Sequence, residues 1–304
     1  MVLNATNTLF KKSLFVLILL FSLNLWGQNQ GYLLIIGGGK RLAYIMQKIV
    51  DLGGGSQSKF LVIPMASSTP LDVALYQKYQ LEKLGAGSVD FIICSRETAD
   101  NDTSLAKLEG VTGIFFSGGD QRRLAAALVG TRFLEKIKEI YRKGGVVAGT
   151  SAGAAVMSRL MITGNELKYP PDEESKNRDE SYPFRTIEEK NIEVKEGFGF
   201  IENAIIDQHF VRRRRHNRLI SLVLENPGLL GIGIDESTAI IVNPDQTFEV
   251  LGENTVLIYD ATGAGNIGLD KNGNLSAFNV KMHLLQSGQR FDFANKKPLP
   301  KEEN

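Results

Sequence analysis

The chain has 304 residues, of which 43% are hydrophobic and 23% are charged, so it can bury a sizeable core and is not disordered over most of its length. Thirty-five basic residues against thirty-four acidic ones leave a formal net charge of +1, which gives no overall field for binding nucleic acid or an anionic membrane. Recognition by charge must therefore come from local groups.

The first residues have the composition of a secretory signal peptide. Lys11 and Lys12 precede an apolar block at 13–23, and polar residues follow from Gln28. Because the block is shorter than the ~20 residues that a spanning helix needs, we expect cleavage and export rather than a retained membrane anchor. We therefore predict a signal peptide over 1–27 and a single mature domain over 28–304, located in the periplasm or secreted, with no membrane contact after cleavage.

Short apolar runs alternate with segments of helical period from Tyr32 onward, which predicts parallel strands joined by helical crossovers. Helices are expected over 41–52, after the cap and first-turn residues Thr69 and Pro70, and over 133–143. The expected strands lie at 32–36, 60–64, 89–94, 113–117 and 146–148. The predicted fold class is α/β, with a mostly parallel sheet and helices on both faces.

The pattern changes after Leu229 to short strands separated by turns. These strands are expected at 231–234, 239–242, 248–251 and 256–259. Their spacing predicts antiparallel strands that close the sheet near the carboxyl terminus. The segment 168–190 is rich in Pro, Asp, Glu, Lys and Asn and has no period, so we predict an exposed insertion there.

Two features of the amino-terminal half are interpreted as structural. Gly37-Gly38-Gly39 matches neither a dinucleotide fingerprint nor a phosphate loop, so we predict a tight strand exit and expect no nucleotide cofactor. Cys94 is the only cysteine and excludes an internal disulfide. It stands in an apolar run without a nearby histidine, which favours a core thiol over a catalytic one.

The pentapeptide Gly149-Thr150-Ser151-Ala152-Gly153 follows a predicted strand and opens an apolar segment, 152–160, expected to be helical. In this strand–turn–helix context, G-x-S-x-G holds an exposed serine at the carboxyl edge of a sheet. The start of the helix also directs backbone N–H groups, including that of Ala152, toward a developing oxyanion. A purely structural turn is the alternative, but the context favours Ser151 as a nucleophile.

A serine nucleophile needs a base, and the chain contains three histidines. His209 ends an apolar strand, where it can reach a site at the carboxyl edge. His216 sits in an arginine run that would oppose an imidazolium, and His283 lies on a late edge segment. For the acid that orients the base, Asp235 and Glu236 both follow another apolar strand, and the spacing leaves open which of them serves.

The fourth predicted strand ends in Gly118-Gly119-Asp120-Gln121, which combines flexible backbone with polar side chains. A second oxyanion donor from Gly119 would complement Ala152. We expect no metal and no other cofactor.

Four ordered motifs together resemble the cyanophycinases, within the peptidase family that also holds aspartyl dipeptidases. They are 118–121, 149–154, 207–210 with the following arginines and Leu219, and 231–236, and the resemblance covers about 32–260. The resemblance implies a glutamine-amidotransferase-like α/β fold and a triad of Ser151, His209 and Glu236. It implies oxyanion donors at Gly119 and Ala152. It further implies substrate contacts from Gln121, Asp207, Gln208, Arg213, Arg215 and Arg218.

The run Arg212–Arg215 departs from the family pattern, in which a small residue separates the two key arginines, so the sequence leaves open which of them reach substrate. Arg215 and Arg218 are spaced to share a helix face, and guanidinium forks suit the carboxylates of an aspartyl substrate. A solvated helix face or a nucleic-acid patch is the alternative for four consecutive arginines.

The resemblance implies a serine-type peptidase that cleaves cyanophycin, a poly-aspartate with arginines on its side chains, to β-aspartyl-arginine. The alternatives are an α- or β-aspartyl dipeptidase and, from another class, a catalytically silent binding protein of the same fold. The expected partner is a peptide or polymer with aspartyl linkages and not a nucleic acid. A homodimer is compatible with the sequence, which does not determine the oligomeric state.

Overall fold

A computed structural model of the chain describes residues 30–169 and 184–300. The predicted signal peptide and most of the predicted insertion lie outside these residues. Within the described ranges, no helix is both long enough and apolar enough to cross a membrane.

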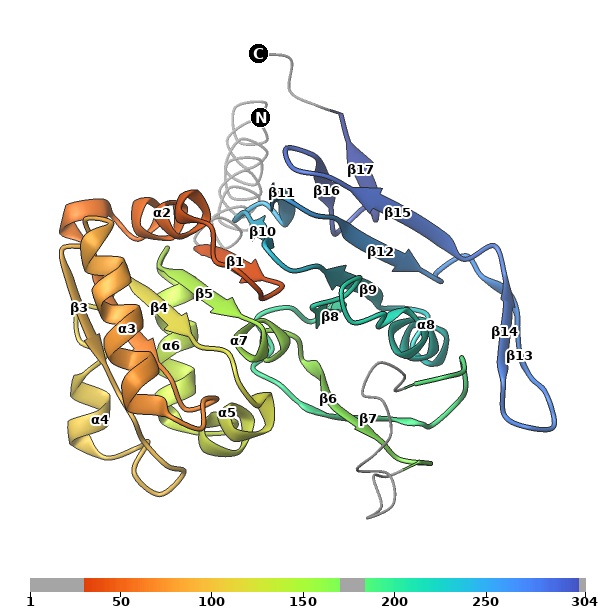
Figure 1. Cartoon of the computed structure of the whole chain (residues 1–304), viewed down its shortest axis with the longest axis horizontal. Helices are drawn as coiled ribbons and strands as arrows, with labels where there is room; N and C mark the ends of the chain where they lie inside the picture. The colour runs from red at the N-terminus through yellow and green to blue at the C-terminus, as the bar shows by residue number, and fades with distance from the viewer. Residues whose placement is uncertain (1–29, 170–183, 301–304) are drawn as a thin grey trace, which may run out of the picture.

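The main sheet of the described chain has nine strands, in the order β17-β16-β11-β10-β1-β5-β4-β2-β3 (Figure 1). Its parallel half consists of β1 (Tyr32–Ile36), β5 (Val146–Thr150), β4 (Gly113–Phe116), β2 (Lys59–Ile63) and β3 (Ser88–Phe91). Its antiparallel half consists of β10 (Thr238–Val242), β11 (Thr247–Gly252), β16 (Arg290–Asp292) and β17 (Lys297–Leu299). The α/β class and the late antiparallel strands are confirmed, but the sheet is parallel only in its first half.

Helices cover both faces of the parallel half. On one face, Leu34 and Ile36 of β1 join the buried cluster of α2 (Ala43–Leu52), which α3 (Pro70–Lys83) enters through Leu81. On the other face, Leu33 and Ile35 join the cluster of α4 (Asp102–Ala106), α5 (Gln121–Leu128) and α6 (Arg132–Arg142). Burial on both faces explains why these strands have continuous apolar runs rather than an alternating pattern.

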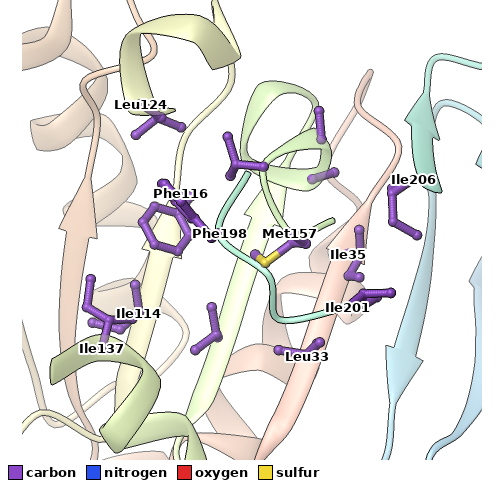
Figure 2. Packing of buried hydrophobic residues seen from close by; sticks show 14 of the residues in the cluster. Leu33, Ile35, Ile114, Phe116, Leu124, Ile137, Met157, Phe198, Ile201 and Ile206 are labelled. Atoms are coloured by element: carbon purple, nitrogen blue, oxygen red, sulfur yellow. The ribbon is translucent and has the colours of Figure 1, made fainter. Parts of the chain in front are cut away.

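Figure 2 shows the cluster on the side of α4, α5 and α6 close up. Phe116 of β4 lies there beside Phe198, which belongs to the connection that leads toward β8. Their ring centroids lie 5.0 Å apart, and Met157 lies in the same cluster, entirely buried. The predicted core thiol of Cys94 is also buried in this cluster, and burial raises the pKa of this thiol to about 11. The helix expected over 152–160 is only a single turn, α7 (Ala152–Ala155), and the chain continues as β6 (Leu160–Glu166). A short apolar run that is buried all round does not distinguish helix from strand.

A second sheet of four strands follows the order β15-β12-β9-β8. It consists of β15 (Lys281–Leu285), β12 (Val256–Asp260), β9 (Leu230–Ile234) and β8 (Ala204–Gln208), and α8 (His216–Glu225) packs on it. The segments 231–234 and 256–259 were expected to close the main sheet, and this expectation is wrong. Glycines in β9 leave the space that this separate layer needs: a Cβ at Gly231 would lie 2.5 Å from Val223 of α8, and one at Gly233 would lie 2.3 Å from the Phe210 ring.

The two sheets meet at the end of β1. The amide of His209, just after β8, donates to the carbonyl of Gly37 at 2.7 Å, and the amide of Ser237 donates to Gly38 at 2.9 Å. Because β8 and β9 run parallel, their carboxyl ends lie side by side at this junction. The junction therefore brings the ends of β1, β5, β8 and β9 to one place.

Two smaller pairs complete the described structure, namely β6 with β7 (Ile192–Glu196) and the hairpin of β13 (Gly265–Leu269) and β14 (Leu275–Phe278), which projects from the body in Figure 1. Of the predicted insertion, the part before β7 is described and is not wholly exposed. Phe184 and Glu188 are buried there, and Glu188 pairs with Lys168 at 3.1 Å. This end of the segment packs against α8 rather than extending into solvent.

Candidate active site

Ser151 lies on a sharp turn between β5 and α7, with φ 53° and ψ −109°. A non-glycine residue with this backbone conformation is strained, and such strain is typical of a nucleophile turn. The glycines on either side make the turn sterically feasible: a Cβ at Gly149 would lie 2.2 Å from the Gly153 carbonyl, and one at Gly153 would lie 2.3 Å from the Phe116 carbonyl. The turn thus requires glycine at both positions.

The three residues of the expected triad form a continuous hydrogen-bonded chain. Ser151 Oγ lies 2.8 Å from His209 Nε2, and His209 Nδ1 lies 2.6 Å from Glu236 Oε1. With the ring proton on Nδ1, the imidazole donates to the carboxylate and leaves Nε2 to accept the hydroxyl proton. This is the geometry that the predicted roles of nucleophile, base and orienting acid require.

The structure also distinguishes the two adjacent carboxylates. Asp235 is buried, and its Oδ1 accepts from the backbone N–H of Arg212 at 2.9 Å, away from the imidazole. Glu236 alone of the two contacts His209.

The other histidines have different partners in the described structure. His216 Nδ1 lies 2.9 Å from the hydroxyl of Tyr259, and the His283 ring packs against Phe291 at 5.3 Å between centroids. Neither residue forms the hydrogen bond to Ser151 that His209 forms.

Burial lowers the pKa of the His209 imidazole, and the nearby cations Arg213 and Arg215 lower it further, while Glu236 acts in the opposite direction. The ring is therefore mostly neutral at neutral pH, which is the state that a general base requires.

Gly38 and Gly39 have a role at the site that the sequence analysis did not identify. A Cβ at Gly38 would lie 2.4 Å from His209 Cε1, and one at Gly39 would lie 2.7 Å from Glu236 Cβ. Both glycines also have positive φ, at 105° and 69°. The predicted strand exit is present, and it additionally leaves the space that the base and the acid occupy. No local signal distinguishes this role from that of an ordinary glycine turn.

The turn at Gly118 and Gly119 lies beside the nucleophile. A Cβ at Gly118 would lie 3.4 Å from Ser151 Cβ, and Gly119 has a φ of 138° with space for no Cβ, because the Ala66 carbonyl would lie 2.1 Å away. Ala152 is the first residue of α7, so its N–H has no acceptor within the helix. The backbone at Gly118 and the start of α7 thus lie beside the serine, and the oxyanion roles expected for Gly119 and Ala152 stay predictions.

The expected substrate contacts at Asp207 and Arg218 take a different place in the structure. Asp207 is 1% exposed and accepts from Arg218 Nε at 2.7 Å and from its Nη2, while Arg215 Nη1 lies 3.7 Å away. The Arg218 guanidinium is itself buried, 5.3 Å from the centroid of the Phe184 ring. Asp207 and Arg218 therefore pair with each other in the interior, where they support the site instead of facing substrate.

The predicted substrate contacts at Gln121 and Arg213 differ in their exposure. Gln121 is buried, and its Nε2 donates to the carbonyls of Ile162 and Thr163 at 2.8 Å, so it ties α5 to β6 rather than facing substrate. Arg213 is exposed close to His209.

Arg215 is half-buried and donates from Nη1 to the carbonyl of Gln208 at 2.7 Å. Burial lowers the pKa of Arg215 to about 10. The Oε1 of Gln208 is buried without a hydrogen-bond partner within the described structure.

A cleft of about 760 Å³ opens in front of Ser151 and His209. Another part of its wall comes from the loop after β1 and from α3, which the sequence analysis did not connect with the site. This part of the wall is made by Lys40, Arg41, Asp72, Val73, Tyr76 and Gln80. In the described residues, no group of three or more His, Cys, Asp or Glu side chains is placed to hold a metal ion.

Residues 33–250 match the peptidase family S51. The chain belongs to this family. It is 34% identical to the cyanophycinase of Trichormus variabilis over 275 residues, which cover 88% of this chain and 87% of that protein. This S51 peptidase is also 23% identical to peptidase E of Nostoc sp., over 73% of its own length and 84% of that protein. Among solved structures it resembles a peptidase from an acI-B1 actinobacterium, with a TM-score of 0.62, 25% identity, and coverage of 88% of this chain and 98% of that one.

Proposed function

We propose that this peptidase is a serine-type cyanophycinase that hydrolyses the poly-aspartate backbone of cyanophycin and releases β-aspartyl-arginine. The observation that carries the proposal is the hydrogen-bonded chain from Ser151 through His209 to Glu236, in a chain that is 34% identical to a cyanophycinase over most of both lengths. The similarity to peptidase E is lower, at 23%, so we place the aspartyl dipeptidase second.

The chemistry follows from the geometry. His209 Nε2 takes the proton of Ser151 as Oγ attacks the aspartyl carbonyl, and the N–H groups of Gly119 and Ala152 stabilise the resulting oxyanion. Nε2 then gives this proton to the leaving amine, and the C–N bond breaks to form an acyl-enzyme. A water molecule then attacks the acyl-enzyme carbonyl while His209 Nε2 takes its proton. Nε2 returns this proton to Ser151 Oγ, and the product leaves with a free carboxyl group. Glu236 holds the ring proton on Nδ1 throughout and stabilises the imidazolium.

The charge around the site supports a substrate that carries carboxylates. Arg213 and Arg215 lie close enough to His209 to lower its pKa, and Lys40 and Arg41 line the cleft. These cations attract the free α-carboxylates of the arginine units on the polymer, and the burial around His209 strengthens that attraction relative to open water. A binding protein of the same fold would need the cations but not a base in contact with a strained serine.

The test is hydrolysis by purified mature chain, 28–304, of cyanophycin and of a panel of α- and β-aspartyl dipeptides, with products identified by mass spectrometry. We expect β-aspartyl-arginine from the polymer and no product from the Ser151→Ala variant. Preferential cleavage of a dipeptide would move the assignment to an aspartyl dipeptidase. No cleavage of any substrate by the wild type would favour the binding protein.

We also propose export, which the composition of 1–27 supports. Expression of the full chain in a host with a Sec pathway should yield periplasmic or secreted protein whose amino terminus lies between Gln28 and Gly31. Recovery of uncleaved protein in the membrane fraction would instead indicate an anchor.

A further inference from the structure

The part of the cleft wall that is formed by α3 and by the loop after β1 carries charged groups that the triad does not use. Asp72, Tyr76 and Gln80 are spaced by four residues along α3, so they share the helix face that lines the cleft. Arg41 comes from the loop after β1 and lines the same cleft. A cation and a carboxylate thus border the space in which a substrate would lie.

Arg41 is held in place from two sides. Its Nη1 donates to Gln77 Oε1 at 2.9 Å, and its guanidinium carbon lies 5.3 Å from the centroid of the Tyr76 ring. Gln77 is entirely buried. Because its oxygen accepts from Arg41, its Nε2 points into the interior, where no acceptor lies within the described parts of the chain. The two contacts together fix the position of the Arg41 guanidinium.

Arg41 and Asp72 keep hydrogen-bonding groups that no other side chain of the described structure engages. Within residues 30–169 and 184–300, Arg41 Nε and Nη2 have no acceptor, and no cation lies within ion-pairing distance of Asp72. The two groups do not pair with each other there either. A fixed guanidinium and a carboxylate on one wall, each with unused hydrogen-bonding capacity, are complementary to a ligand that carries both charges.

We propose that this wall is a subsite for a zwitterionic arginine unit, in which Arg41 binds the free α-carboxylate of the unit and Asp72 binds its guanidinium. The subsite rests on the proposed function. In a β-aspartyl-arginine unit the arginine is joined through its α-amino group, so its carboxylate and its guanidinium both remain free. Each charge then meets an opposite planar group, and each pairing allows two parallel hydrogen bonds. The subsite selects substrates with arginine on the side chain over plain poly-aspartate.

The test measures binding by calorimetry in the inactive Ser151→Ala background, with a four-unit β-aspartyl-arginine oligomer. Two analogues each remove one kind of charge from every unit: one has amidated arginine carboxylates, and the other has citrulline in place of arginine. We expect amidation to weaken binding about tenfold or more in Ser151→Ala. In the double variant that also carries Arg41→Gln, amidation should cause little further loss of affinity. Citrulline should show the same dependence on Asp72→Asn.

The control is Lys48→Gln, which removes one positive charge from the exposed side of α2, outside the cleft. It should leave the amidation penalty unchanged. Arg41→Lys serves as a second variant that keeps the charge but not the fork, and it should recover only part of the affinity. Thermal unfolding of each variant checks that the fold is retained.

The outcomes separate the subsite from the proposed function. An amidation penalty that persists in full in Arg41→Gln would overturn the subsite, as would failure of Ser151→Ala to bind the oligomer at all. Coupled binding together with no turnover by the active chain would instead leave the subsite standing and reject the proposed hydrolysis. If the active chain hydrolyses the oligomer but the penalties of the two analogues do not depend on Arg41 and Asp72, the subsite alone is rejected.

Discussion

Replacing Glu236 by Gln should nearly abolish turnover although the variant keeps the size and shape of the side chain. Glu236 Oε1 lies 2.6 Å from His209 Nδ1, and His209 Nε2 lies 2.8 Å from Ser151 Oγ. A carboxamide can present its NH₂ to Nδ1, which forces the ring proton onto Nε2. In that tautomer the ring cannot accept the hydroxyl proton, and the imidazolium also loses its counter-charge.

The expected loss is about 10³- to 10⁴-fold in kcat, by analogy with the same change in other serine hydrolase triads. At about 1.36 kcal/mol for each factor of ten, this raises the barrier by about 4–5 kcal/mol. The matched control is Asp235→Asn, because within the described residues the Asp235 side chain accepts from the Arg212 backbone N–H at 2.9 Å, and an amide oxygen can accept equally well. Its kcat should stay within about twofold of the wild type.

The assay is steady-state hydrolysis of the β-aspartyl-arginine oligomer, with thermal unfolding as a check on folding. If Asp235→Asn proved to be the crippling change and Glu236→Gln retained activity, the assignment of the orienting carboxylate from this geometry would be refuted. Equal, small effects of both changes would show that the base needs no orienting acid.

Three further outcomes are expected. Gly38→Ala should lower kcat at least tenfold, because its Cβ would lie 2.4 Å from His209. The control is Gly55→Ala, at φ 58° in open space, which should leave kcat unchanged and lower the unfolding free energy by about 1 kcal/mol. Similar kcat values for the two variants would contradict this expectation. Arg213→Gln removes a cation that lowers the pKa of His209, so the acid limb of kcat/KM, where the base becomes protonated as the pH falls, should move to higher pH; an unmoved limb would count against the contact. Asp207→Asn leaves buried arginines without their carboxylate and should lower the unfolding free energy by about 3–5 kcal/mol in denaturant titration, and a loss below about 1 kcal/mol would show that the pair is not structural.

The parts of the site that depend on neighbouring residues were predictable. Ser151 stands in a strand–turn–helix pattern with glycines at fixed offsets, and the strained turn of the structure lies at this residue. The choice of His209 followed from the small number of histidines and from its place at the end of an apolar run. The glutamine-amidotransferase likeness and the homodimer stay predictions, because no observation on the described chain tests them.

Other assignments depended on contacts between distant parts of the chain. Arg218 and Arg215 are spaced to share a helix face, yet Arg218 lies inside because Asp207 and Phe184 provide a buried partner and a ring there. Spacing along α8 describes which residues neighbour each other on the helix, but it does not say whether that face meets solvent or a buried carboxylate.

The sequence by itself therefore determined the alternation of strands and helices and the family to which the motifs belong, and it predicted Ser151 as the nucleophile, since each is encoded in local order. Tertiary structure alone decided which of Asp235 and Glu236 faces the base, why Gly38 must lack a side chain, and that Arg41 borders the cleft beside α3. The first two depend on how two sheets meet at the end of β1, and the third depends on the packing of α3 beside the loop after β1. Residues nearly two hundred positions apart come into contact where the sheets meet, and no local periodicity records that approach.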